Sequence, residues 1–161
     1  IKLVEKEVVP LFDQFEEKRM SALAAKLGIG DYQKSDEHLV MKFLTYLETQ
    51  SLDFTNAFRK LPELLKGDLS FYPETEELKA FLVEWKNRVQ DVEDLDKINP
   101  IYIPRNHLVQ KVIDDAYEGS FDSFHELLDV VTSPFEMKGG LEQYARGPKP
   151  SERVYQTFCG T

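Results

Sequence analysis

Apolar residues recur every three or four positions along most of this chain, which is the spacing of one face of an α-helix. Six segments show the pattern: residues 3–27, 39–47, 54–65, 78–89, 108–116 and 124–131. No segment of useful length alternates apolar and polar residues as a half-buried strand would. We therefore predict an all-α fold, an irregular bundle of about five to seven helices with an extended C-terminal tail.

Residues with special backbone preferences mark the expected helix boundaries. Pro10 is expected in the first turn of a helix, where a missing N–H is tolerated, and Gly28 should end that helix. Pro62 should kink the third helix or split it, and residues 99–104, with two prolines, should be extended. The expected N-terminal caps are Ser35, Asp53, Thr75 and, in a capping box with Glu126, Ser123.

The predicted helices give way to glycine and proline after residue 137. We therefore expect residues 1–137 to form a helical domain and residues 138–161 to form an irregular tail. Because the chain begins at Ile1 without a methionine, we also expect an upstream part of the protein.

The length and the charge balance exclude some kinds of partner. The chain has 161 residues, the length of one ordinary domain, and 42% of them are hydrophobic. Its 29 acidic residues outnumber 20 basic ones, for a net charge of −9, which disfavours nucleic acid and anionic lipid as partners. The longest apolar runs are far too short to span a bilayer.

Residue patterns that carry catalysis or metal binding are missing from this sequence. The three histidines, His38, His107 and His125, have no zinc-ligand spacing and no cysteine pair to join. There is no phosphate-binding glycine loop and no nucleophile beside a base. We therefore predict no catalytic, cofactor-binding or metal site in this chain, and no activity of the chain by itself.

Three segments invite a more specific interpretation. Residues 53–59 are explained by a capping Asp53, core-facing Phe54 and Phe58 and a surface ion pair, although contact with a partner domain is also open. Arg105, just before a predicted helix, could hold a phosphate or a carboxylate from a neighbouring helix, and we favour the carboxylate. The acidic run over residues 91–96 is expected to be a solvated turn.

Cys159, the one cysteine, lies third from the end of the chain. A single cysteine excludes an internal disulfide and fits a reducing compartment. A thiol in a terminal tail is accessible, which is one of the two requirements for redox chemistry, the other being a lowered pKa.

Several of these motifs together, in this order, resemble the C-terminal region of the selenoprotein O (SelO) family, and the resemblance covers essentially the whole chain. The residues that carry it are Lys26-Leu27-Gly28, Asp53-Phe54-Thr55-Asn56-x-Phe58-Arg59, Asn99-Pro100-x-Tyr102-x-x-Arg105-Asn106-x-Leu108, Gly119-Ser120-Phe121, Ser133-Pro134-Phe135 and Cys159.

The resemblance implies a kinase-like parent protein that transfers AMP from ATP to hydroxyl side chains of other proteins, with Mg²⁺ or Mn²⁺. In the family, the residues that bind nucleotide and metal lie N-terminal to the region seen here, so no catalytic residue is carried over. The implied partners are the parent's own N-terminal kinase-like domain and its protein substrates. The implied compartment is the bacterial cytoplasm, or the mitochondrion in a eukaryote.

The resemblance also gives Cys159 an expected regulatory role. Some relatives have selenocysteine or cysteine at this position, and in bacterial members the thiol is thought to pair with a cysteine of the catalytic domain. Many relatives end in Cys-Ser-Ser, whereas this chain ends in Cys159-Gly160-Thr161. The alternative interpretation of the whole chain is a free-standing helical module that binds another protein through an acidic face.

Overall fold

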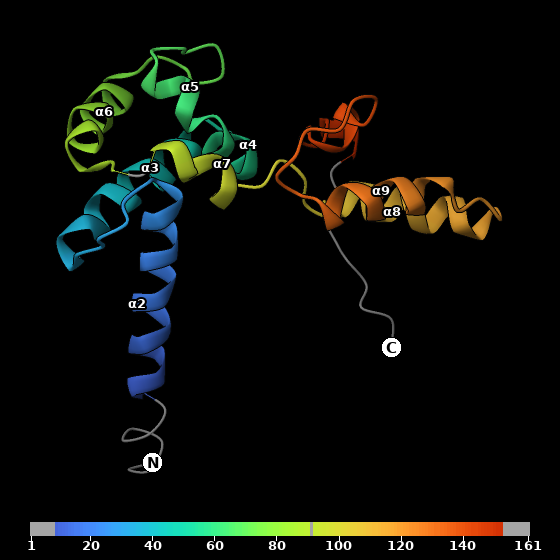
Figure 1. Cartoon of the computed structure of the whole chain (residues 1–161), viewed down its shortest axis with the longest axis horizontal. Helices are drawn as coiled ribbons and strands as arrows, with labels where there is room; N and C mark the ends of the chain where they lie inside the picture. Colours follow the sequence, from blue (N-terminus) through green and yellow to red (C-terminus); the bar gives the residue numbers. More distant parts are fainter. Residues whose placement is uncertain (1–8, 91, 153–161) are drawn as a thin grey trace. The chain divides into compact units, whose positions relative to one another are not determined.

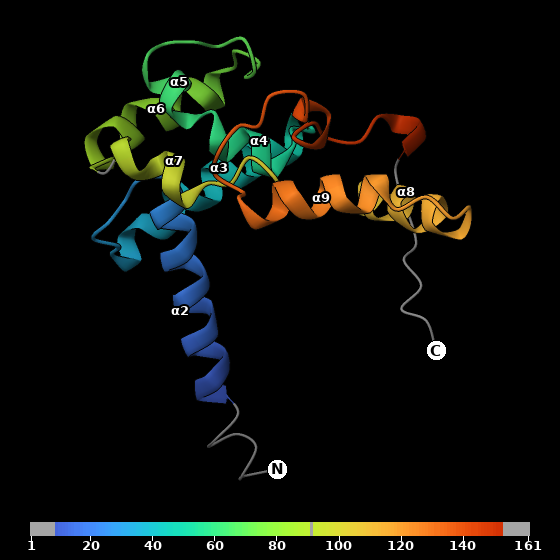
Figure 2. The same ribbon diagram turned by 45° about the vertical axis from the view of Figure 1, so that its right-hand side comes forward.

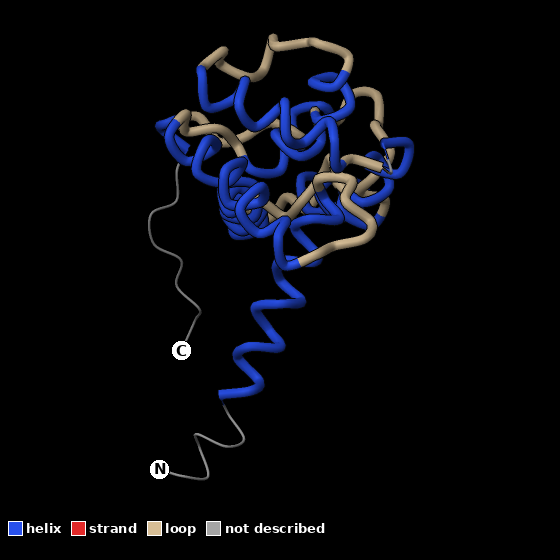
Figure 3. The backbone as a smooth tube through the Cα atoms, turned by 90° about the vertical axis from the view of Figure 1, so that its left-hand side faces the viewer, coloured by secondary structure: helices blue, strands red, loops and turns tan. Residues whose placement is uncertain are grey.

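The computed structural model describes residues 9–90 and 92–152, and over these ranges every regular element is helical (Figure 3). The α-helices are α2 (Val9–Lys26), α3 (Glu37–Thr49), α4 (Phe54–Arg59), α5 (Leu61–Leu65), α6 (Glu76–Arg88), α7 (Leu95–Ile98), α8 (Asn106–Tyr117) and α9 (Asp122–Thr132). Single 3₁₀ turns are η1 (Lys34–Asp36), η2 (Val92–Asp94), η3 (Glu142–Tyr144) and η4 (Pro150–Glu152). The predicted all-α fold is confirmed. None of the described helices combines the length and apolar character needed to cross a bilayer.

The chain divides into two compact units, Ile1–Ile98 and Asn99–Thr161, and each has a hydrophobic core of its own (Figure 1). This boundary does not coincide with the one expected at residue 137. The sequence pattern placed it where helices stop, whereas the structure divides the chain within the extended segment that follows α7.

The core of the first unit is built between α3 and α6, with α2, α4 and α5 around it. Three aromatic rings stack at its centre. The ring centroids of Phe43 and Phe81 are 4.9 Å apart, and those of Phe81 and Trp85 are 5.4 Å apart. All three side chains are fully buried, and burying each is worth roughly 2–3 kcal/mol.

Most of the expected boundaries in this unit are confirmed. Asp53 accepts a hydrogen bond of 2.9 Å from the backbone N–H of Asn56, and Thr75 caps α6 in the same way. Pro10 lies in the first turn of α2, and Gly28 follows that helix with a φ of 74°, a conformation that glycine adopts without strain. The third predicted helix is split into α4 and α5 as expected, with Lys60 between them and Pro62 in the first turn of α5.

The prediction that Ser35 caps the second helix is wrong. Ser35 lies inside the 3₁₀ turn η1, and α3 begins after Asp36. The carboxylate of Asp36 turns back to accept a hydrogen bond of 2.8 Å from the backbone N–H of Gln33, so Asp36 stabilises the turn that leads into α3.

The second unit is centred on α8 and α9, which pack side by side as a hairpin (Figure 2). Leu108, Leu127 and Val130 form its core with Ile101, Tyr102 and Tyr144. The predicted capping box at Ser123 is wrong. Because α9 begins one residue earlier, at Asp122, Ser123 is buried within the helix, and Phe121 holds the capping position.

Residues 138–152, expected as part of an irregular tail, are held against this hairpin. The backbone N–H of Lys138 donates to the hydroxyl of Tyr102 at 3.0 Å, and its ammonium group contacts the Asp129 carboxylate at 2.6 Å. The hydroxyl of Tyr144 donates to Glu126 at 2.6 Å. Burial and this contact raise the pKa of Tyr144, so its hydroxyl remains a donor.

Candidate functional site

Cys159, the one site residue that the sequence predicts, lies outside the described residues. Its redox role therefore stays a prediction. What the structure describes is the segment from which the tail continues, and that segment is fixed by charged groups.

An ion pair between Arg146 and Glu152 closes the last described loop. The two guanidinium nitrogens of Arg146 lie 2.5 and 2.7 Å from the two carboxylate oxygens of Glu152. The backbone N–H of Lys149 donates to the same carboxylate at 2.8 Å. Because the pair is bidentate and encloses Pro148 and Pro150, the loop has one preferred geometry.

The same contacts fix the charge of both groups. The hydrogen bonds from Arg146, together with that from the Lys149 N–H, lower the pKa of Glu152 to about 2. The carboxylate in turn raises the pKa of Arg146. Both groups therefore stay ionised at any physiological pH, and the loop closure is insensitive to pH in that range.

Arg105 is buried at the start of α8 and reaches towards the segment that carries this loop. Its Nη2 donates to the carbonyl oxygen of Ala145 at 3.4 Å, next to Arg146. One of its contacts is thus with a backbone carbonyl. The carboxylate partner that we expected for Arg105 stays a prediction.

The segment over residues 53–59 holds its own unit together. Arg59 donates to the carbonyl of Asp96 at 2.6 Å and lies 3.3 Å from its carboxylate, which confirms the surface ion pair. Phe58 is buried, but Phe54 is 45% exposed, so the prediction that Phe54 faces the core is wrong. In the described part of the acidic run, Glu93, Asp94 and Asp96 are exposed as predicted, but they lie in η2 and α7, and the buried side chain of Leu95 anchors α7.

A groove of about 680 Å³ lies beside α3 and α6. At its edge, Glu84 accepts from His38 at 2.9 Å and from Lys42 at 2.5 Å, and these hydrogen bonds lower the pKa of Glu84. Tyr46 lines the groove and donates to the carbonyl of Pro73 at 2.7 Å. Burial raises the pKa of Tyr46 to about 12, so the groove carries a neutral hydroxyl rather than a phenolate.

The structure also shows polar pairs that the sequence analysis missed. His38 and Glu84 are 46 residues apart, and Asp36 and Arg88 are 52 residues apart, so no local spacing could have indicated either pair. Among the residues that the structure describes, no group of three or more histidine, cysteine or acidic side chains could hold a metal ion.

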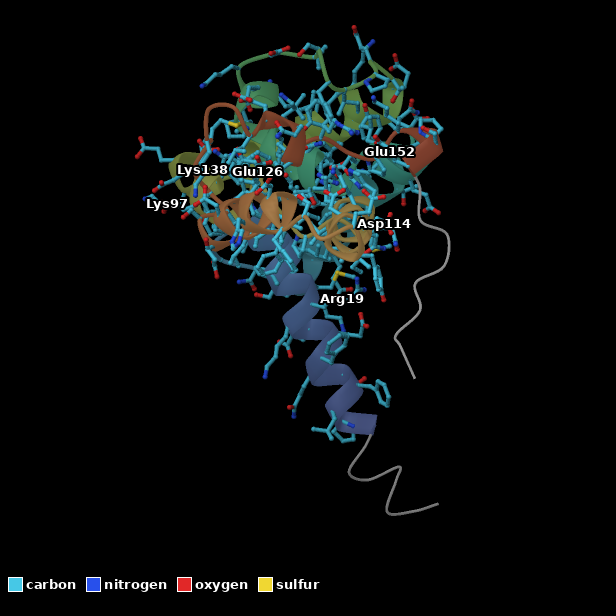
Figure 4. All side chains as sticks on the ribbon, turned by 90° about the vertical axis from the view of Figure 1, so that its right-hand side faces the viewer. Arg19, Lys97, Asp114, Glu126, Lys138 and Glu152 are labelled. Carbon is cyan, nitrogen blue, oxygen red and sulfur yellow. The ribbon has the colours of Figure 1, made fainter. Side chains whose placement is uncertain are left out.

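The first half of α2 presents an apolar stripe to solvent. Leu11, Phe12 and Phe15 are each 60–66% exposed, and Arg19 projects further along the same helix (Figure 4). The second half of α2 is held in the core by Met20, Ala24 and Leu27. The second half of this helix is therefore stabilised by packing, and the first half extends beyond the hydrophobic core of its unit (Figure 1).

Comparison with known proteins places the chain in a family. It is 36% identical to the protein nucleotidyltransferase YdiU of Rhodopseudomonas palustris over 164 residues, which cover 92% of this chain and 33% of that protein. It is 33% identical to YdiU of Rhizobium johnstonii, again over 92% of this chain and 33% of that protein. YdiU proteins form the SelO family. This chain belongs to the SelO family.

A further SelO-family relative, YdiU of Agrobacterium fabrum, is 31% identical over 160 residues, or 91% of this chain and 33% of that protein. No family model matches the sequence. The chain spans about a third of the length of the SelO-family relatives that it matches.

Proposed function

We propose that this chain is the non-catalytic, C-terminal helical portion of a SelO-like protein adenylyltransferase. The observation that carries the proposal is the match of nearly the whole chain to about a third of proteins named protein nucleotidyltransferases. In this proposal the longer protein transfers AMP from ATP to hydroxyl side chains of protein substrates in the bacterial cytoplasm.

The chemistry of the described side chains supports a non-catalytic role. ATP and Mg²⁺ or Mn²⁺ need convergent carboxylates and a phosphate-binding loop, and residues 9–90 and 92–152 supply no cluster of three metal-ligating side chains. The described residues thus do not fit the metal, and in this proposal the rest of the longer protein holds both metal and nucleotide.

The exposed stripe on α2 supports attachment to a larger body. Isolated helices of this length are marginally stable in water, and most helical stability comes from packing. Leu11, Phe12 and Phe15 find no such packing within the described part of their own unit. We propose that they pack against the kinase-like portion of the longer protein.

The proposed role of Cys159 is to make the activity respond to redox state. The tail that carries it begins at the loop closed by Arg146 and Glu152, so that loop sets the point from which the thiol can reach a partner cysteine. Oxidation would join the two thiolates as a disulfide, with two electrons passing to a cellular oxidant such as a disulfide or peroxide.

The division of labour is tested by measuring AMP transfer. The chain alone should bind ATP no better than an unrelated acidic protein in calorimetry. The longer protein should label a target protein with AMP. In that protein, Phe12→Ser together with Phe15→Ser should weaken the packing of this helical portion against the kinase-like portion. Tight ATP binding by the chain alone would refute the proposal.

The redox role has a separate test in the longer protein. Cys159→Ser should leave AMP transfer under reducing conditions unchanged and remove its response to oxidant. The matched control is Ser151→Ala, an exposed polar residue close to the same tail. An unchanged oxidant response in Cys159→Ser would show that the thiol has no regulatory function.

A second candidate function is a free-standing helical module that binds a protein through an acidic face. The observation that favours it is the net charge of −9. It requires an association that weakens strongly as salt is added and that persists in the absence of any kinase-like domain.

A further inference from the structure

The α8–α9 hairpin carries a row of apolar side chains that remain exposed in the described structure. On α8, Val109 and Ile113 are 36% and 43% exposed, and on α9, Phe124 and Leu128 are 43% and 45% exposed. These values exceed what a core position shows, yet the residues are as apolar as core residues. They form what we call the hairpin face.

Helix geometry places these four residues on one side of the hairpin. Val109 and Ile113 directly follow the inward-facing Leu108 and Val112, and Leu128 directly follows the buried Leu127. Each step along a helix turns the side chain by about 100°. The short connection makes α8 and α9 antiparallel neighbours. On two antiparallel helices, moving one residue on from a position that faces the partner helix leads to the same side of the pair.

The opposite side of the hairpin is covered by its own chain. Residues one position before the buried ones face this opposite side. One of them is Glu126, whose carboxylate accepts a hydrogen bond from the hydroxyl of Tyr144. His107 and Lys111 line a small pocket with Ser151 and Glu152 on this side. Figure 4 labels Asp114, Glu126 and Glu152 among these groups. Residues 138–152 thus close one side of the hairpin and leave the hairpin face open.

Acidic side chains strongly outnumber basic ones in the hairpin. Between residues 106 and 132 there is one lysine, Lys111, which pairs with Asp115 at 2.5 Å. Six acidic residues lie in the same range: Asp114, Asp115, Glu118, Asp122, Glu126 and Asp129. Glu118 and Asp122 lie at the helix connection, beside the exposed rings of Tyr117 and Phe121.

We propose that the hairpin face is a docking surface for a protein partner that contributes an amphipathic, basic helix. The apolar side of that helix would cover Val109, Ile113, Phe124 and Leu128, and its lysines or arginines would lie near Glu118 and Asp122. The aromatic rings at the connection are the residue type that dominates binding energy in such interfaces.

Charge argues against a second copy of this chain as the occupant. Lys111, the one lysine or arginine between residues 106 and 132, lies on the opposite side of the hairpin. The hairpin of a second copy would therefore offer no basic side chain to Glu118 and Asp122. The proposal goes beyond the proposed function, since it concerns binding by this unit whether or not the chain is joined to a transferase.

The test uses the full 161-residue chain and a synthetic helical peptide of about 18 residues, with leucine on one side and lysine on the other. A matched peptide carries glutamate in place of lysine. Fluorescence anisotropy should show binding of the lysine peptide only, and amide shifts in labelled protein should change along α8 and α9. Ile113→Ser and Leu128→Ser should each weaken binding about tenfold.

The control variant is Val83→Ser, an apolar residue of α6 that is 68% exposed, and it should bind as the unchanged chain does. Circular dichroism would verify that all variants are folded. Equal binding of both peptides, equal binding by Leu128→Ser, or shifts confined to the first unit would overturn the proposal. A dimer of the chain that dissociates on Leu128→Ser would also overturn the proposal, because the hairpin face would then be an interface between two copies. Loss of lysine-peptide binding when the chain is part of the longer protein would likewise overturn it, by assigning the face to that protein.

Discussion

The indole nitrogen of Trp85 donates a hydrogen bond of 2.7 Å to the carbonyl oxygen of Leu27, which lies 58 residues earlier. Leu27 follows the last residue of α2, where carbonyl groups have lost their partners within the helix. Trp85 therefore both fills the core of the first unit and satisfies a buried acceptor at the end of α2.

Replacing Trp85 with phenylalanine should remove the hydrogen bond to Leu27 and part of the packing in the core. We expect Trp85→Phe to lower the free energy of unfolding by about 2–3 kcal/mol, since it leaves a cavity and an unpaired carbonyl. Val83→Ala, in the same helix but exposed, should change it by less than about 0.5 kcal/mol. Urea unfolding followed by circular dichroism measures both. Equal stabilities would show that the hydrogen bond and the packing of Trp85 are dispensable.

The buried carboxylate of Asp36 depends on one arginine. Arg88 donates to both of its oxygens at 2.8 Å and also to the carbonyl of Asp31. We expect Arg88→Met to lower the urea midpoint by roughly 1 M, because it leaves a buried charge without its partner. Arg19→Met, which removes an exposed pair with Glu16, should shift the midpoint little. The Asp36 interpretation fails if both variants behave alike.

The same pair makes stability depend on acid. The hydrogen bond from Arg88 lowers the pKa of Asp36 below its ordinary value of 3.8. The stabilisation is therefore present above about pH 4 and is lost as the pH falls through the lower pKa of the folded protein. In Arg88→Met this part of the acid dependence should shrink. Unfolding curves from pH 2 to 6 measure it, and identical profiles would contradict the assignment.

Two glycines of the second unit form a matched pair for backbone strain. Gly119 has a φ of 87°, and a Cβ there would meet nothing within 4 Å, so only the backbone conformation opposes a side chain. We expect Gly119→Ala to destabilise the unit by about 1 kcal/mol. Gly139 is equally open but has no positive φ, so Gly139→Ala should be neutral or slightly stabilising. Thermal unfolding distinguishes them, and the reverse order would be inconsistent with this geometry.

The loop before the tail can be followed through one carboxylate. In the unchanged chain, a carbon-detected NMR titration should give Glu152 a pKa of about 2. Arg146→Gln should raise that pKa towards the ordinary value of 4.5, because its two hydrogen bonds are lost. Lys97→Gln is the control, since Lys97 belongs to the first unit and pairs with Asp94. A Glu152 pKa near 4.5 in the unchanged chain would mean that the loop is not closed.

Local signals in the sequence were sufficient for most helices. The spacing of apolar residues gave the helical class, and Asp53, Thr75 and Pro62 act where such residues usually act. These features depend on neighbours a few residues away, which a sequence displays directly.

The features that were predicted wrongly or missed depend on distant residues. Asp36 replaces Ser35 at the start of α3 because Arg88, far along the chain, holds its carboxylate. Ser123 is buried rather than capping because α9 packs against α8. The closure of Arg146 on Glu152 crosses two prolines and follows no helical spacing. Tertiary packing decides such contacts, and a local pattern does not contain it.

The exposed first half of α2 has a consequence for amide exchange with deuterium. From Asp13 to Phe15, the N–H groups rely on helical hydrogen bonds in a part of α2 whose side chains are exposed rather than packed in the core. Near Ala24 and Leu27 the same helix is sealed inside that core. One continuous helix should therefore hold both rapidly labelled and slowly labelled amides, and a bound protein that protects the rapid set would reveal where it touches.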